Sequence, residues 1–154
     1  MTNHGVSIAT QNVGGYGRNV GRQMRITEGG AKKATLERLL KLHRSDVLVL
    51  TETRIDTKER AGTIRLNGLK VIHSSCSGRA AGGVSVLVRN NVMCIENSHR
   101  ESRIPGYFSI SVCQINNVKT IIGGVYLDSS NRDETSWETV QELWDAVDEL
   151  KTIY

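Results

Sequence analysis

Residues 47–54 read VLVLTETR, and this stretch decides the fold class. Its first four residues are all apolar, which is typical of a short central strand buried on both faces. Polar residues follow at once, so the strand ends close to Leu50. We therefore expect this strand to lie inside a sheet, with its polar residues at the strand's carboxyl end.

The segments before this strand indicate a crossover unit. Residues 7–13 (SIATQNV) alternate and run into Gly14-Gly15, which predicts a strand ending in a loop. Residues 14–30 are rich in Gly and Arg and are expected to form an exposed loop. Residues 31–44 have helical spacing of Leu36, Leu39, Leu40 and His43. Strand, helix and strand in this order predict two parallel strands.

The segments after it indicate more sheet and a final helix. Strands are predicted over residues 69–74, 83–89 and 92–97, with a turn at Asn90-Asn91. Residues 107–115 and 118–127 predict a hairpin around Asn116-Asn117. Residues 133–153 predict a helix whose apolar stripe comprises Trp137, Val140, Trp144 and Val147, flanked by Leu143 and Leu150. The fold class is thus α/β or α+β, one mixed β-sheet with flanking helices.

Composition places the chain among ordinary globular proteins. Its 154 residues fit one domain over residues 1–154, and 38% are apolar and 23% charged. No apolar run approaches the roughly 20 residues that span a bilayer, and the start lacks the pattern of a signal peptide. We expect an intracellular protein, nuclear or cytoplasmic, that does not contact a membrane.

The three cysteines, Cys76, Cys94 and Cys113, are odd in number and far apart in the sequence. They have no CxxC spacing, so no metal or redox motif is indicated. We expect reduced thiols with a structural role.

Charge is unevenly distributed. The net charge is +4, and the first 44 residues are strongly basic, whereas residues 128–151 are mainly acidic. A basic segment suits a polyanionic partner such as nucleic acid. The alternative is that these charges only solvate the surface.

Polar clusters close the two predicted parallel strands. Asn12 ends the first, and Glu52 and Arg54 follow the second. The carboxyl edge of an open α/β sheet is where ligands bind. A partly desolvated carboxylate at Glu52 needs a cation or several donors, and Mg²⁺ takes one or two carboxylates while keeping waters for a phosphate. The alternative is that Glu52 forms an ion pair with Arg54 or caps the next segment. Tyr126 ends a late strand, where it either binds a phosphate or packs half-buried.

Four segments in this order, QNVGG, VLVLTETR, GGVSVLVRNN and IIGGVYLDSSN, resemble the front half of the endonuclease/exonuclease/phosphatase superfamily. The chain looks most like the apurinic-type endonuclease domains of LINE-type retrotransposons. The resemblance implies about one half of the two-sheet DNase I-like sandwich and a metal-dependent endonuclease activity on phosphodiesters.

The resemblance also implies roles for individual residues. Asn12 matches the active-site asparagine, Glu52 the metal-binding glutamate, and Tyr126 the tyrosine that touches the scissile phosphate. The implied cofactor is Mg²⁺ or Mn²⁺, and the implied partner is nucleic acid, DNA more than RNA. Further nucleic-acid contacts are predicted from the arginines of a Gly- and Arg-rich loop, of the VLVLTETR segment and of a later loop: Arg18, Arg22, Arg25, Arg54 and Arg79. The arginine-rich loop is equally compatible with a solvated loop that binds nothing.

Two departures weaken the implied activity. The family commonly has a proline two residues after the tyrosine, where this chain has Asp128. A Gly-Asp-Phe-Asn strand and a later Ser-Asp-His motif are also missing from these residues. We therefore expect a nuclease fragment that is inactive or weakly active alone. The alternatives are a non-catalytic module that binds nucleic acid or protein, and one half of a split nuclease. An apolar sheet face left exposed would favour a homodimer or a missing second half.

Overall fold

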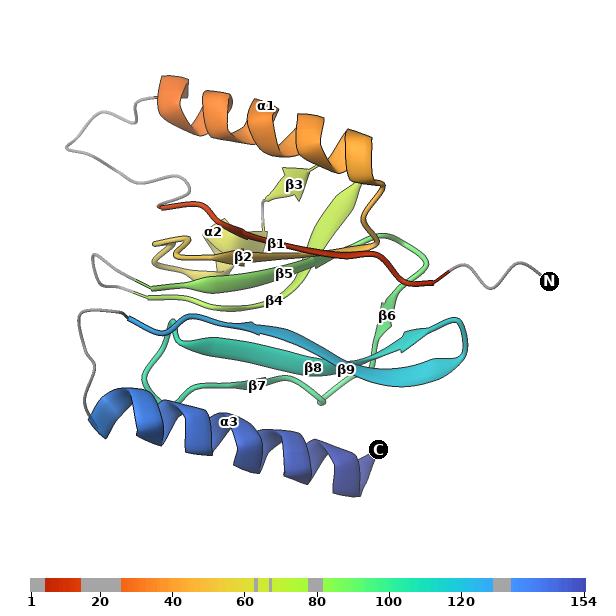
Figure 1. The fold of residues 1–154 in the computed structure, drawn as a ribbon, viewed down its shortest axis with the longest axis vertical. Helices are drawn as coiled ribbons and strands as arrows, with labels where there is room; N and C mark the ends of the chain where they lie inside the picture. The colour runs from red at the N-terminus through yellow and green to blue at the C-terminus, as the bar shows by residue number, and fades with distance from the viewer. Residues whose placement is uncertain (1–4, 15–25, 63, 67, 78–81, 129–133) are drawn as a thin grey trace.

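A computed structural model of the chain describes residues 5–14, 26–62, 64–66, 68–77, 82–128 and 134–154. In these residues two β-sheets face each other, and a long helix covers the outer side of each sheet (Figure 1). The first sheet has the strand order β1-β2-β5-β4-β3. Its strands are β1 (Ile8–Asn12), β2 (Val47–Thr51), β3 (Arg65–Leu66), β4 (Leu69–Ser75) and β5 (Val84–Val88).

The parallel pair predicted from the sequence is confirmed. β1 and β2 run parallel in register from Ile8 opposite Val47 to Asn12 opposite Thr51, and α1 (Ile26–His43) makes the crossover. All four residues of VLVL are buried. Leu48 and Leu50 belong to the core that contains Leu36 and Leu40 of α1, while the alternate valines face the second sheet. The uniform apolar run therefore reflects burial on both faces of the strand.

The helix begins at Ile26, so the predicted loop over residues 14–30 is wrong for residues 26–30. Gly29 and Gly30 lie inside it. Each glycine costs about 1 kcal/mol in a helix interior, which the remaining turns of a long helix offset. The rest of that predicted loop, residues 15–25, lies outside the described residues.

The second sheet is built around the predicted hairpin, which is also confirmed. β8 (Phe108–Ile115) and β9 (Val118–Val125) pair along their whole length. Asn116 and Asn117 join them with φ angles of 50° and 66°, the left-handed conformation that two-residue hairpin turns require. The short strands β6 (Met93–Cys94) and β7 (Arg100–Glu101) pair with β8.

The predicted fold class, a mixed β-sheet structure with flanking helices, is confirmed, but the strands form two sheets where one was expected. The predicted turn at Asn90-Asn91 does form, with the Val92 amide donating to the Arg89 carbonyl at 3.1 Å. This turn carries the chain from β5 into the second sheet, and the predicted strand over residues 92–97 shrinks to β6. The expected exposed apolar face is covered, since Val49 and Val86 of the first sheet share a buried cluster with Ile122 of the second.

The final helix, α3 (Glu134–Ile153), forms as predicted but turns another face to the sheet. Trp137 and Trp144 are 74% and 58% exposed. Leu150 is buried, and Leu143, Ala146 and Val147 pack with it against the outer side of β8. These four positions also have helical spacing, and the small Ala146 allows close approach of helix and sheet. None of the described helices is long and apolar enough to cross a membrane.

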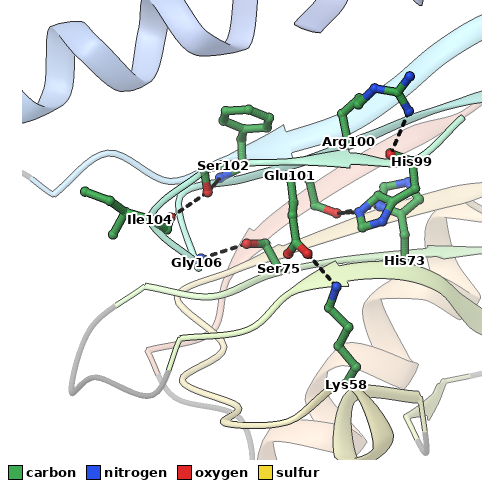
Figure 2. Close-up of polar contacts among 11 residues, drawn as sticks. Lys58, His73, Ser75, His99, Arg100, Glu101, Ser102, Ile104 and Gly106 are labelled. Atoms are coloured by element: carbon green, nitrogen blue, oxygen red, sulfur yellow. Dashed lines mark hydrogen bonds and ion pairs between the residues drawn. The ribbon is translucent and has the colours of Figure 1, made fainter.

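Polar side chains cross the space between the two sheets. His73 of β4 and His99, just before β7, are stacked with ring centroids 5.0 Å apart (Figure 2). The Ser109 hydroxyl of β8 lies 2.7 Å from Nδ1 of His73 and 2.9 Å from Nε2 of His99. Nearby, the Gly106 amide donates to Oγ of Ser75 at 2.7 Å. Hydrogen bonds as well as apolar contacts therefore join the sheets.

A substitution in the hairpin turn tests the register of β8 and β9. Asn117→Val is expected to lower the free energy of unfolding by about 1–2 kcal/mol, because a β-branched side chain is strained in the left-handed conformation. Urea denaturation measures the change, and Lys119→Val, at an exposed position of β9, is the matched control. Equal effects of the two substitutions would contradict the observed turn conformation.

Candidate active site at the strand ends

The carboxyl ends of β1, β2 and β9 lie at the same end of the sandwich (Figure 1). Asn12 is the last residue of β1 and is paired in register with Thr51, the residue before Glu52. Tyr126 directly follows β9. The fold thus brings together the three candidate residues that the sequence places at the ends of separate strands.

Glu52 accepts a hydrogen bond from a neighbouring arginine. The Arg54 guanidinium donates this bond to the Glu52 carboxylate. The Arg54 hydrogen bond is the main reason why the pKa of Glu52 is below its ordinary value, and Asn12 adds to the effect. Glu52 is consequently ionised at neutral pH. Glu52 and Arg54 thus form the ion pair that was the alternative interpretation of the sequence.

The turn that carries Glu52 has an unusual backbone. Glu52 and Arg54 have φ angles of 56° and 54°, which non-glycine residues rarely adopt. The Thr53 amide donates to the Gly83 carbonyl at 3.1 Å and fixes the turn. A side chain at Gly83 would place its Cβ 2.4 Å from Oγ1 of Thr53, so only glycine fits there. Backbone strain of this kind concentrates at functional sites.

Tyr126 lies close enough to this carboxylate to be affected by its charge. Burial is the largest cause raising the pKa of Tyr126, followed by the negative charges of Asp128 and Glu52. Its amide donates to the Tyr107 carbonyl at 2.6 Å, and the two rings are 6.4 Å apart. The phenol is therefore neutral at neutral pH and is available as a hydrogen-bond donor.

Comparisons with known proteins identify the fold. No family model matches the sequence, and no curated protein matches it. Among solved structures, the AP endonuclease LMAP from Leishmania major matches with a TM-score of 0.60 and 15% identity, covering 94% of this chain and 47% of that one. The chain has the DNase I-like fold.

A truncated Caenorhabditis elegans TDP2 also matches, with a TM-score of 0.47 and 17% identity, over 79% of this chain and 47% of that one. The chain spans about half the length of each of these structures. The match to the AP endonuclease LMAP confirms the fold-level resemblance seen in the sequence, as a portion of the DNase I-like sandwich.

Asp128 is a member of this DNase I-like strand-end cluster that sequence reasoning treated only as a departure from the family. Its negative charge contributes to the raised pKa of Tyr126 and partly opposes the lowering of the pKa of Glu52. The signal available in the sequence was an acid two residues beyond the strand-end tyrosine. The sequence pattern did not show that its charge acts on Glu52.

The hard oxygen donors of this cluster fit a magnesium-type ion only in part. In the part of the chain that the structure describes, no group of three His, Cys, Asp or Glu side chains is arranged to hold a metal. Magnesium needs only one or two protein carboxylates and takes its other ligands from water and phosphate. Glu52, which is ionised, is one such carboxylate.

Of the five arginines predicted to contact nucleic acid, the structure describes only Arg54. Its Nε is buried and has no hydrogen-bond partner among the described residues, while its other end binds Glu52. A buried donor left unsatisfied is uncommon and suits a site that receives an anion. Arg18, Arg22, Arg25 and Arg79 lie outside the described residues.

Proposed function

We propose that this chain supplies one part of the active site of a metal-dependent nuclease. The main support for this proposal is that Asn12, ionised Glu52 and Tyr126 lie at the same end of a DNase I-like fold. In this proposal Glu52 holds Mg²⁺ or Mn²⁺, while Asn12 and Tyr126 donate hydrogen bonds to the scissile phosphate. An ion held by Glu52 would supply positive charge beside a phosphate bound by Asn12 and Tyr126.

The arginines extend the proposal to nucleic acid. The free Nε of Arg54 is a donor for a phosphate oxygen beside the proposed metal. Arg18, Arg22, Arg25 and Arg79 would contribute further contacts to the nucleic-acid backbone. We propose DNA ahead of RNA as the substrate, as in the LINE-type endonuclease domains that the sequence resembles.

Activity is tested by plasmid nicking with Mg²⁺ or Mn²⁺. We expect weak nicking by this chain, lowered about 100-fold or more by Glu52→Gln, because the variant keeps the shape of the side chain and removes the charge. Glu96→Gln, at an exposed position, is the matched control and should cut like the wild type. Equal nicking by wild type and Glu52→Gln would refute the catalytic role.

A binding measurement separates the alternatives. Mn²⁺ binding followed by electron paramagnetic resonance should weaken in Glu52→Gln, whether or not the chain cuts. Salt-sensitive DNA binding without cleavage would indicate a non-catalytic module. Cleavage that appears only with a second polypeptide would indicate a split nuclease. A second copy as that polypeptide would make cleavage depend on the concentration of this chain.

A further inference from the structure

Two cysteines that are far apart in the sequence lie opposite each other on neighbouring strands of the second sheet. Cys94 of β6 is directly opposite Cys113 of β8 in the strand register. The Ile95 amide donates to the Val112 carbonyl at 2.8 Å, so that neighbouring pair is hydrogen-bonded. Pairs alternate in antiparallel sheets, and Cys94 and Cys113 therefore form a non-hydrogen-bonded pair, whose Cα atoms are about 4.5 Å apart. This separation falls within the roughly 4.4–6.8 Å that disulfides span.

Both sulfur atoms also contact one hydroxyl group, that of Ser111. Oγ of Ser111 lies 3.4 Å from Sγ of Cys94 and 3.7 Å from Sγ of Cys113. Both side chains thus point to the same face of the sheet and need no backbone movement to approach each other. Both are free thiols in this structure.

We propose that Cys94 and Cys113 form a reversible disulfide when the protein meets a hydroperoxide. This modification site is separate from the proposed nuclease site and does not depend on it. The disulfide would tie β6, a two-residue strand, to β8 beside the turn by which the chain crosses between the sheets.

The two cysteines differ in solvent exposure and in pKa, and this reaction needs both differences. Cys94 is half-buried, whereas Cys113 is completely buried, so an oxidant reaches Cys94 first. The hydrogen bond from Cys113, helped by those of Ser111 and Ser98, lowers the pKa of Cys94. The same hydrogen bond and burial raise the pKa of Cys113. Cys94 is therefore the thiolate nucleophile and Cys113 the protonated partner.

The chemistry balances with hydrogen peroxide as the oxidant. The Cys94 thiolate attacks one peroxide oxygen, the O–O bond breaks, and hydroxide leaves with a proton from solvent as water. Sγ of Cys113 then attacks the sulfenic sulfur of Cys94, the S–O bond breaks, and the released hydroxide takes the Cys113 proton as a second water. The two thiols lose two electrons, and the peroxide gains them.

The third cysteine is the internal control. Cys76 follows β4 and packs against the other core, and burial is the main cause raising the pKa of its thiol. It has neither the lowered pKa nor an opposed cysteine in the strand register. Oxidation that distinguishes Cys94 and Cys113 from Cys76 would therefore reflect the geometry of the folded sheet.

Peroxide treatment of the reduced chain tests the proposal. We expect two of the three thiols to disappear, a peptide map that links Cys94 to Cys113, and full recovery with dithiothreitol. Cys76→Ser should form the same link at an unchanged rate. Cys94→Ser should slow thiol loss about tenfold or more, as expected when the thiolate is removed. Cys113→Ala should stop at a sulfenic acid on Cys94 that dimedone traps.

The peptide map of the wild-type chain needs no substitution, so it tests the proposal even if a variant fails to fold. Oxidation of the urea-unfolded chain should give mixed linkages, because the opposed geometry is lost. Three intact thiols after peroxide, a dominant link to Cys76 in the folded chain, or links only between separate chains would each overturn the proposal.

Discussion

Replacing Gly124 by alanine is expected to lower the free energy of unfolding by about 3 kcal/mol, at the upper end of the range for overpacked cores. Gly124 lies on β9 where the second sheet packs against the first. A Cβ atom there would be 2.2 Å from Cγ1 of Val49 and 3.0 Å from Cγ1 of Val84. Both valines are buried in the cluster between the sheets and have little room to move.

Urea denaturation of Gly124→Ala measures this effect. Gly62→Ala, at the exposed end of α2 (Lys58–Gly62), adds the same methyl group where nothing lies within 4 Å, and it should change stability by no more than about 0.5 kcal/mol. Similar midpoints for the two variants would mean that the sheets do not approach each other at Gly124.

Acid is expected to destabilise the protein through His73. Burial is the larger cause lowering the pKa of His73 to about 3 from an ordinary value of 6.5, and the charge of His99 adds to it. Below pH 6.5, His73 therefore binds a proton in the unfolded chain, whereas in the folded chain it stays neutral until the pH approaches 3. Stability from this group is fully present above pH 6.5 and falls as the pH drops towards 3, by roughly 4 kcal/mol in total.

The groups around His73 set the design of the experiment. His99 and Ser109 contact it, and the charges of Glu101, Lys58 and Arg100 act on His99 (Figure 2). Carboxylates with lowered pKa also lose stability in acid, so the difference between wild type and variant is the informative quantity.

His73→Gln should flatten the dependence of the free energy of unfolding on pH between 6.5 and 3. His43→Gln, which changes an exposed histidine of α1, should keep the wild-type slope. Parallel curves for wild type and His73→Gln would show that His73 is not held neutral between the sheets.

The candidate site was largely predictable because its parts end strands that local pattern reveals. The apolar VLVL run and the alternating SIATQNV predicted parallel neighbours, which the register of β1 and β2 confirms. Parallel neighbours end at one edge, so Asn12 and Glu52 had to meet. The pairing of Glu52 with Arg54 was one of two readings, and Asp128 was not recognised, because charge alone does not show which group a loop residue faces.

What the sequence determined by itself is local: the strand around Leu48, the crossover helix, and the turn at Asn116-Asn117, each set by periodicity or backbone preference over a few residues. Only the tertiary structure decided the rest. The turn at Asn90-Asn91 leads into a second sheet, α3 exposes Trp137 and Trp144, and Cys94 meets Cys113. These outcomes depend on how distant segments share one core, and neighbouring residues along the chain carry no record of that packing.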